Sequence, residues 1–170
     1  MNRRVPFGLW LGISAVVVLV DQLLKFVIVE RFREGEQLTV IPGLFDLTLW
    51  YNRGAAFSFL AGHDGWQRWF FVAIAVVAAL FIVYLLARHH QQTLFAAGLA
   101  LVLGGAVGNL IDRLRIGKVV DFLLFYQGSW SFPAFNIADS AITAGAALLI
   151  VDEIRRIRTS PKEKAVDQRQ

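Results

Sequence analysis

Four long apolar stretches constrain the fold of this 170-residue chain more than any other feature. A membrane-spanning helix needs about 20 predominantly apolar residues, because the hydrocarbon core of a bilayer is roughly 30 Å thick. The stretches cover residues 7–29, 69–87, 94–111 and 134–151. Hydrophobic residues make up 56% of the chain and charged residues 18%, which is not typical of a soluble domain. The sequence therefore predicts an all-α membrane protein with four transmembrane helices.

The distribution of Lys and Arg predicts how these helices are oriented. Four crossings place both termini on the same side, and the segments on the inner side of a membrane are enriched in Lys and Arg. Basic residues precede the first stretch, follow the second and cluster after the fourth: Arg3, Arg4, Arg88, Arg155, Arg156, Arg158, Lys162 and Lys164. We therefore expect both termini inside and residues 30–68 and 112–133 outside. The formal net charge of +4 then reflects this orientation, and no basic face with interleaved aromatic residues suggests nucleic-acid binding.

The two outer segments differ in their patterns. In the first, Pro42-Gly43 is a turn signal between two strand-like runs, which predicts a small sheet at the outer membrane surface. Apolar residues of the second run alternate with other residues, so one face is expected to be buried: Phe45, Leu47, Leu49 and Tyr51. The second segment is expected to be a short loop with turns at Gly117 and Gly128. Residues 1–158 are predicted to form one unit, followed by a polar, frayed inner tail at 159–170.

Polar side chains inside the apolar stretches gather toward their outer ends. Asp21 and Lys25 are four residues apart in the first stretch, so they share a helix face. The others close the third stretch or open the fourth: Asn109, Asp112, Arg113, Asn136 and Asp139. A buried carboxylate such as that of Asp139 costs kilocalories unless it has partners. We expect Asp121, from the second outer segment, to reach it.

A pair of neighbouring carboxylates has a specific chemistry. Both cannot ionise at once, so the pair shares a proton. One member then takes a proton from water, while the other polarises a carbonyl and later protonates the leaving amine. Asp121 and Asp139 thus indicate peptide hydrolysis without a covalent intermediate, metal or cofactor. The chain has no cysteine to supply a thiol nucleophile. A pair of Lys25 with Ser58 or Ser140 stays open, although no spacing supports it.

Other functions and structural roles also stay open at this point. Asp21 and Lys25 fit a simple intrahelical ion pair, Arg113 fits structural support, and the asparagines fit hydrogen bonds between helices. A small transporter is the main alternative function, and a structural assembly factor is another. Transporters usually have midplane sites and inverted repeats, whereas this chain has no repeat and its polar residues favour one end. Gly104 and Gly108 are expected to serve helix packing.

Five sequence blocks, in the same order, make this chain resemble the lipoprotein signal peptidases, or signal peptidase II, of bacterial inner membranes. The resemblance covers about residues 7–155. The blocks are DQLLK (21–25), YNRGAAFSFL (51–60), GGAVGNLIDRL (104–114), VVDF (119–122) and FPAFNIADSAI (132–142). Arg53 stands where the family usually has a small residue after YN.

The resemblance implies an intramembrane aspartyl endopeptidase for prolipoproteins, which cuts just before a cysteine that carries a diacylglyceryl group. It implies Asp121 and Asp139 as the catalytic pair. It also implies five residues that line or brace the site: Asn52, Gly54, Asn109, Arg113 and Asn136. It implies a structural or substrate-orienting pair of Asp21 and Lys25, and we expect Asp112 to support the site or bind substrate as well. We further expect a multi-pass, monomeric protein of the inner membrane without a cofactor, with its site toward the periplasmic leaflet.

The resemblance carries two further expectations. The helix of the signal peptide is expected to lie against the spans of the enzyme, where Gly104 and Gly108 would leave room for it. Cyclic peptides that block an aspartyl dyad are expected to inhibit cleavage.

Overall fold

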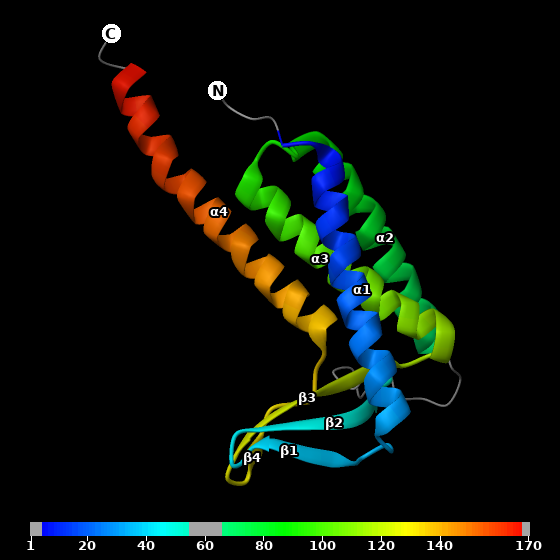
Figure 1. The fold of residues 1–170 in the computed structure, drawn as a ribbon. Coiled ribbons are helices and arrows are strands. Elements are labelled where there is room, and N and C mark those ends of the chain that lie inside the picture. Colours follow the sequence, from blue (N-terminus) through cyan, green and yellow to red (C-terminus); the bar gives the residue numbers. More distant parts are fainter. Residues whose placement is uncertain (1–4, 55–65, 168–170) are drawn as a thin grey trace.

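Four helices and a sheet of four strands make up the described parts of the chain, residues 5–54 and 66–167, in a computed structural model (Figure 1). The helices are α1 (Phe7–Arg31), α2 (Trp66–His89), α3 (Thr93–Ile116) and α4 (Ile137–Asp167). The strands are β1 (Gln37–Ile41), β2 (Phe45–Asn52), β3 (Val119–Gln127) and β4 (Trp130–Ser131). The basic residues Arg3 and Arg4 lie outside the described residues.

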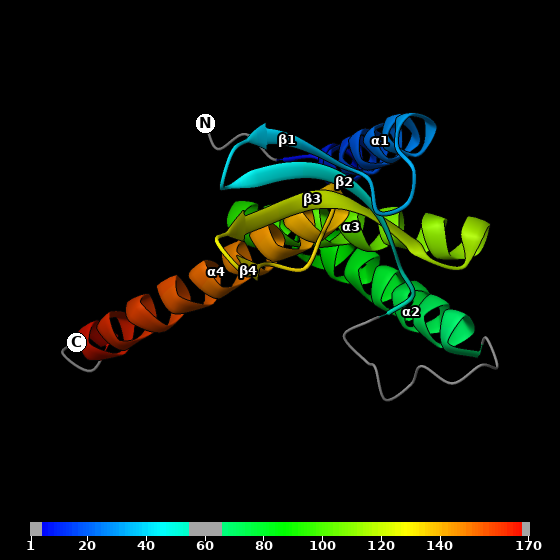
Figure 2. The same ribbon diagram turned by 90° about the horizontal axis from the view of Figure 1, so that it is seen from below.

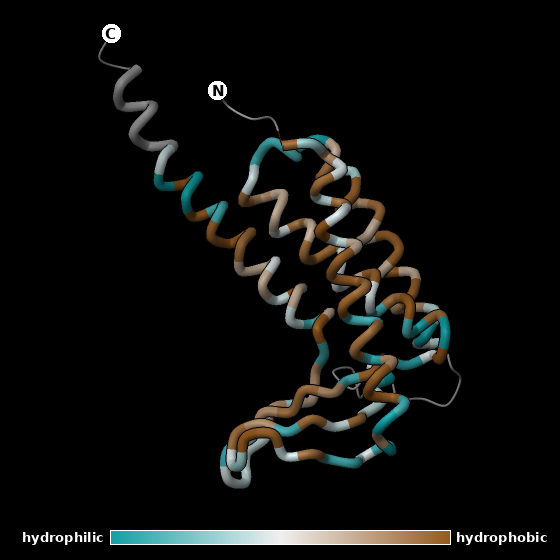
Figure 3. The backbone as a smooth tube through the Cα atoms, in the orientation of Figure 1, coloured by the Kyte–Doolittle hydropathy of each residue, from teal (hydrophilic) through white to brown (hydrophobic). Residues whose placement is uncertain are grey.

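Within the described residues, three helices are long and apolar enough to cross a membrane. They are Phe7–Arg31, Arg68–His89 and Thr93–Ile116. Figure 3 shows apolar residues along the length of these helices. The apolar run of α4 is bounded by Asp139 on one side and by Asp152 and Glu153 on the other. The membrane prediction therefore agrees with three helices, and a fourth crossing by residues 134–151 stays a prediction.

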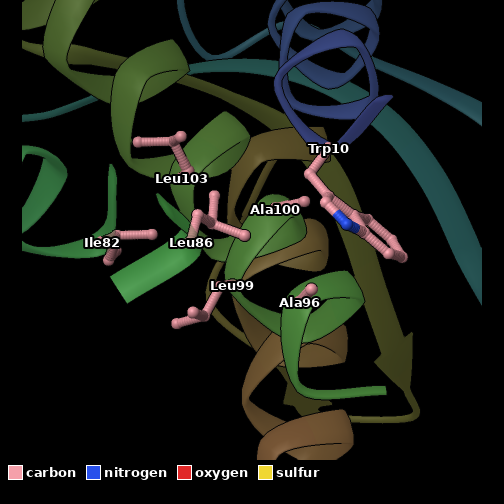
Figure 4. Packing of buried hydrophobic residues seen from close by; sticks show 7 residues of the cluster. All are labelled: Trp10, Ile82, Leu86, Ala96, Leu99, Ala100 and Leu103. Carbon is pink, nitrogen blue, oxygen red and sulfur yellow. The ribbon is translucent and has the colours of Figure 1, made fainter. Parts of the chain in front are cut away.

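Helix α3 is the centre of the bundle, because α1, α2 and α4 all pack against it. At the end of the bundle near the N-terminus, the helices bury a purely apolar cluster that is anchored on α3 (Figure 4). Its members are Trp10, Ile82, Leu86, Ala96, Leu99, Ala100 and Leu103. The polar residues that the sequence singled out are absent from this described cluster, so one end of the bundle is a plain hydrophobic core.

The glycines of α3 are packed against neighbouring helices. A Cβ atom added at Gly104 would lie 2.7 Å from the Cβ of Val17, and one at Gly108 would lie 2.7 Å from Asp21 Oδ2. The expectation that these glycines leave room for a substrate helix is therefore wrong, because α1 fills that room. Their predicted role in helix packing is confirmed.

The sheet has the antiparallel order β1-β2-β3-β4. The predicted hairpin of β1 and β2 is confirmed, with Gly43 at φ 77° in its turn. The expectation of a loop over the second outer segment is wrong, because Val119–Gln127 forms strand β3. This run is rich in β-branched and aromatic residues, which favour strands. Gly117 and Gly128 bound the run, as predicted for turns, with φ values of 74° and 59°.

The buried side chains of β2 differ from the predicted alternation. Asp46 and Thr48 are buried, whereas Phe45 and Leu47 are only half-buried and Leu49 is buried as predicted. The pairing of β2 with β3 shifts register between Leu47 and Trp50. A strict period of two cannot continue through such an irregularity.

The sheet lies across one end of the bundle, between the end of α1 and the start of α4 (Figures 1 and 2). Ile28 of α1 packs there with Leu49, Val120 and Phe122 of the two central strands. Ile137, the first residue of α4, packs on the same cluster, so β3 lies beside the first turn of α4. At its other end, α4 continues as a helix to Asp167. The expectation of a frayed tail from residue 159 is therefore wrong for residues 159–167.

Candidate active site

Asp139 belongs to the first turn of α4 and closes that turn with Asn136. The side chain of Asn136 accepts a hydrogen bond from the Asp139 backbone N–H over 2.9 Å. In return, Asp139 Oδ2 accepts one from the Asn136 backbone N–H over 3.3 Å. This reciprocal pattern is a capping box, in which two N–H groups at a helix start are satisfied together. The position and orientation of the Asp139 carboxylate are therefore part of how α4 begins.

Asp121 points into the same region from strand β3. Its side chain is 2% exposed, and two asparagine side chains hold its two oxygens. Asn136 Nδ2 donates to Asp121 Oδ1 over 2.7 Å, and Asn52 Nδ2 donates to Asp121 Oδ2 over 3.0 Å. The carboxyl of Asp121 is thus buried and fixed at both oxygens.

Asn136 is completely buried and contacts both aspartates. The residue therefore brings Asp121 and Asp139 to one site, as the sequence predicted. Burial raises the pKa of the Asp121 carboxyl from 3.8 to about 7, and the negative charge of Asp139 adds to this increase. The hydrogen bonds from Asn52 and Asn136 and the charge of Lys25 act in the opposite direction. At neutral pH, a proton on Asp121 is therefore readily gained and lost.

Asn109 of α3 connects Asp139 to a charged cluster on the other side of the site. Asn109 Nδ2 donates to Asp139 Oδ1 over 2.7 Å. Asn109 Oδ1 accepts from Lys25 Nζ over 2.9 Å and from Asn136 Nδ2 over 3.2 Å. Since Lys25 can only donate, its ammonium fixes which end of the Asn109 amide faces Asp139.

The predicted pair of Asp21 and Lys25 is an ion pair of 2.8 Å, but it is not isolated. Lys25 Nζ lies 2.8 Å from Asp21 Oδ2 and also 2.8 Å from Asp112 Oδ2. The side chains are exposed by 0%, 3% and 6% for Asp21, Lys25 and Asp112 respectively. The sequence left open whether Asp21 and Lys25 form a simple intrahelical pair. They instead belong to a cluster with Asp112, and this cluster joins α1 to α3.

Arg113 and Gly54 lie at the edge of the site, next to the start of α2. The Arg113 guanidinium lies 5.3 Å from the centre of the Phe71 ring, and its Nη1 donates to the Asn109 carbonyl over 3.3 Å. The backbone N–H of Gly54 donates to Asn52 Oδ1 over 2.8 Å. A Cβ atom at Gly54 would lie 2.7 Å from Phe71 Cε2, and its φ of 102° favours glycine. Structural support, as predicted for Arg113, fits these contacts.

Sequence reasoning missed two residues that touch the site. Gln22 Nε2 donates to Asp112 Oδ1 over 2.9 Å and to the carbonyl of Gly108 over 3.1 Å. Its position between Asp21 and Lys25, as a further polar residue in an apolar stretch, was an available signal. Phe71 lies in the uncharged apolar stretch of residues 69–87, so no sequence pattern distinguished it.

The serine alternative finds no support in the described contacts. Ser140 Oγ donates to the Asn136 carbonyl over 2.9 Å, as a serine does within its own helix. Lys25 is engaged by Asp21, Asp112 and Asn109. Ser58 lies outside the described residues. Among the side chains that the structure describes, no group of His, Asp or Glu has the arrangement of a metal site.

Comparison with protein families matches residues 13–155 to the signal peptidase II model, described as "Signal peptidase (SPase) II". The chain belongs to the signal peptidase II family. Two relatives named lipoprotein signal peptidase are from Burkholderia vietnamiensis and Paraburkholderia phymatum. They are 59% and 56% identical to this family member over 149 residues, which are 88% of this chain and 89% of each relative.

Solved structures support the same assignment of fold. One bacterial membrane enzyme has a TM-score of 0.81 and 33% identity, over 91% of this chain and 93% of that one. A second has a TM-score of 0.77 and 34% identity, over 89% and 96%. As a member of the signal peptidase II family, the chain is a peptidase, and its apolar helices fit a membrane enzyme. Membership favours the peptidase hypothesis over a transporter or an assembly factor.

Proposed function

We propose that this signal peptidase II family member removes the signal peptide from diacylglyceryl-modified prolipoproteins, using Asp121 and Asp139 to activate water. The scissile bond lies just before the lipidated cysteine. The observation that carries the proposal is Asn136, which contacts both carboxyls in a buried setting. Two acids held by one residue, with the pKa of one raised to about 7, have the properties of a general acid and a general base.

We assign the shared proton of the resting pair to Asp121. Its carboxyl is more deeply buried than that of Asp139, which is only half-buried and accepts hydrogen bonds from Asn109 and from the Asn136 backbone. In the first step, Asp139 takes a proton from water while the resulting hydroxide attacks the peptide carbonyl carbon. Asp121 gives its proton to the carbonyl oxygen.

The second step breaks the C–N bond of the tetrahedral intermediate. Because Asp121 has given its proton to the carbonyl oxygen, the leaving amine nitrogen receives its proton from Asp139, and not, as predicted from the sequence, from the member that polarises the carbonyl. The proton on the carbonyl oxygen then returns to Asp121. Atoms balance, because one water is consumed and an acid and an amine are formed. The cleavage rate is expected to fall as the pH rises through about 7, because Asp121 then loses the proton that the first step requires.

The position of the site fits a substrate that stays attached to the bilayer. The candidate spans α1 and α3 contribute Lys25, Asn109 and Arg113, whereas Asp121 comes from the sheet outside these spans. A peptide bond held at this junction meets water and the carboxyl pair while its lipid chains remain in the membrane. We infer that the junction lies at the periplasmic leaflet of the inner membrane, because the basic residues Arg155 and Arg158 lie at the other end.

A cleavage assay in detergent micelles tests the proposal. The purified protein is given a prolipoprotein that carries its diacylglyceryl cysteine and, in parallel, the same precursor without lipid. We expect cleavage of the lipidated precursor only, and a loss on the order of 100- to 10,000-fold in Asp121→Asn and in Asp139→Asn, which is what a general acid or base typically contributes.

Asp152→Asn is the matched control for this assay. It makes the same chemical change in α4, at a carboxylate that pairs with Arg156 over 3.0 Å and lies near the other end of the apolar run. We expect it to cleave at the wild-type rate. Cleavage that survives in a folded Asp121→Asn or Asp139→Asn protein contradicts the aspartyl mechanism. Equal cleavage of both precursors contradicts the proposed substrate class.

A further inference from the structure

We propose that Lys25 is a positioning residue that sets the separation and orientation of Asp121 and Asp139, an inference that rests on the proposed function. Lys25 is 3% exposed and lies on α1, which carries neither aspartate. Its ammonium has three N–H groups, and three acceptors surround it at hydrogen-bond distance. These are Asp21 Oδ2 at 2.8 Å, Asp112 Oδ2 at 2.8 Å and Asn109 Oδ1 at 2.9 Å.

Each acceptor of Lys25 holds an atom beside or within the carboxyl pair. Asp21 Oδ1 accepts from the backbone N–H of Ala138 over 2.9 Å, next to Asp139. Asp112 Oδ2 accepts from the backbone N–H of Val120 over 3.1 Å, next to Asp121. Through Asp21 and Asp112, the Lys25 ammonium is therefore connected to the backbone next to both Asp139 and Asp121.

The third acceptor, Asn109, contacts a carboxylate directly. Asn109 Nδ2 donates to Asp139 Oδ1 over 2.7 Å, and Asn109 Oδ1 also receives the Asn136 amide that donates to Asp121. Without Lys25, Asn109 Oδ1 loses the charged and shorter of its two donors, and only the Asn136 amide at 3.2 Å remains. The start of α4 and the start of β3 would then lose the contacts through which both are held by Lys25 of α1.

An alternative explanation is that Lys25 merely neutralises two buried acids. Removing a cation from such a cluster leaves buried charges unpaired, and this destabilises a protein wherever the cluster lies. A positioning role requires more, namely that local order at Val120 and Ala138 depends on Lys25. The test therefore measures order at these two backbone positions separately from activity.

Three variants separate charge, geometry and general stability. Lys25→Met removes the charge and all three donors. Lys25→Arg keeps the charge on a planar group that cannot match three acceptors arranged for an ammonium. Ser14→Ala is the matched control, because it removes a buried hydrogen bond of 2.8 Å between α1 and Ala100 of α3, remote from the carboxyl pair. If Lys25→Met does not fold, Lys25→Met/Asp112→Asn takes its place, because the net charge of the cluster then equals that of the wild type.

The first measurement is hydrogen–deuterium exchange of the purified proteins in detergent. We expect faster exchange over residues 119–122 and 137–140 in both Lys25 variants, and wild-type exchange there in Ser14→Ala. The second measurement is kcat and KM for the lipidated precursor. We expect kcat to fall on the order of 100-fold with little change in KM, since a displacement of about 1 Å can cost that much.

The pH profile reports the charge of Lys25 separately from its effect on backbone order. Charged groups that face Asp121 are Asp139 from α4, Lys25 from α1 and Arg113 from α3, while β2 contributes the neutral Asn52. The charge of Lys25 lowers the pKa of Asp121, so its removal raises that pKa. The decline of activity at alkaline pH is expected to move to higher pH in Lys25→Met and to stay in place in Lys25→Arg.

Unchanged exchange in both segments of a folded Lys25→Met protein overturns the inference, whatever the cleavage assay gives. Exchange that rises equally in Ser14→Ala also overturns it, because the effect is then one of general stability. If exchange changes as expected but the wild-type protein does not cleave the lipidated precursor, the positioning role stands and the proposed function fails.

Discussion

At the scale of single residues, Asn136 combines a structural and a chemical task. Its amide nitrogen donates to Asp121, while its amide oxygen caps the helix that carries Asp139. Caps of this kind contribute about 1 kcal/mol to stability. The same side chain therefore caps α4 and holds the Asp121 carboxyl, so a displacement of Asn136 would affect both aspartates.

The raised pKa of Asp121 predicts how stability depends on pH. The carboxyl titrates near 3.8 when unfolded and near 7 when folded, so the folded state keeps a proton that the unfolded state has lost between these values. The free energy of unfolding from this group therefore falls as the pH rises through that window and levels off above about 7. The change is expected to stay below about 4 kcal/mol.

Thermal unfolding in detergent at a series of pH values measures this dependence. Asp121→Asn is the appropriate comparison, because its side chain does not titrate while the other carboxyls still do. We expect the difference in Tm between wild type and variant to change between pH 4 and 7 and to be constant above. A constant difference across the whole range would show that burial does not perturb Asp121.

At the scale of secondary-structure elements, the start of α4 is held by its neighbours as much as by its own sequence. Asp21 of α1 accepts the Ala138 N–H, and Gly105 of α3 lies in direct contact with the Ala138 carbonyl. Small residues continue this contact along the two helices, where Gly98 meets the backbone of Gly145. The close approach of α3 and α4 therefore fixes the position of Asp139 relative to β3.

Gly105→Ala tests this dependence. The added Cβ meets the Ala138 carbonyl and the Ile142 side chain, so α4 must shift. We expect a stability loss of about 1–3 kcal/mol, as for overpacked cores, and a large loss of cleavage activity. Gly12→Ala in α1 is the control, because nothing lies within 4 Å of its added Cβ. Wild-type activity in Gly105→Ala would mean that the approach of α3 to α4 does not position Asp139.

The sequence predicted the helices and the composition of the site better than it predicted the sheet. Apolar length indicated α1, α2 and α3, and isolated polar residues indicated Asp121, Asp139 and their partners. Strand β3 was mistaken for a loop, since its apolar residues, interrupted by Asp121, lack the alternation of a half-buried strand. The link from Lys25 to Asp112 was also beyond prediction, because it depends on how α1 and α3 face each other.

At the scale of the whole molecule, the two ends of the helix bundle carry different sets of charged and polar residues. The sheet lies at one end of the helices, and the start of α1 and the end of α4 lie at the other (Figure 1). The carboxyl pair lies at the end with the sheet, because Asp121 belongs to β3. Arg155 and Arg158 follow the apolar run of α4 at the end away from the sheet. If α4 crosses the membrane, these arginines and the hairpin of β3 and β4 lie on opposite sides.

Cysteine labelling tests the fourth crossing directly, because the chain has no cysteine of its own. Ser129→Cys places a thiol in the exposed turn between β3 and β4, and Arg158→Cys places one in an exposed position of α4. A maleimide that cannot cross membranes is expected to label Ser129→Cys in intact spheroplasts and Arg158→Cys only after lysis. Labelling of both before lysis would place both ends of α4 outside.

The hydrogen bond between Asp21 and Ala138 joins residues 117 positions apart, and this distance has a consequence for biosynthesis. A ribosome delivers α1 long before α4, so the nascent chain carries its buried acids without their last partner. The contacts of Asn109 with Asp139 and of Asp121 with Asn136 likewise require residues at the start of α4. This part of the candidate site can therefore form only after the final helix has been made and has docked.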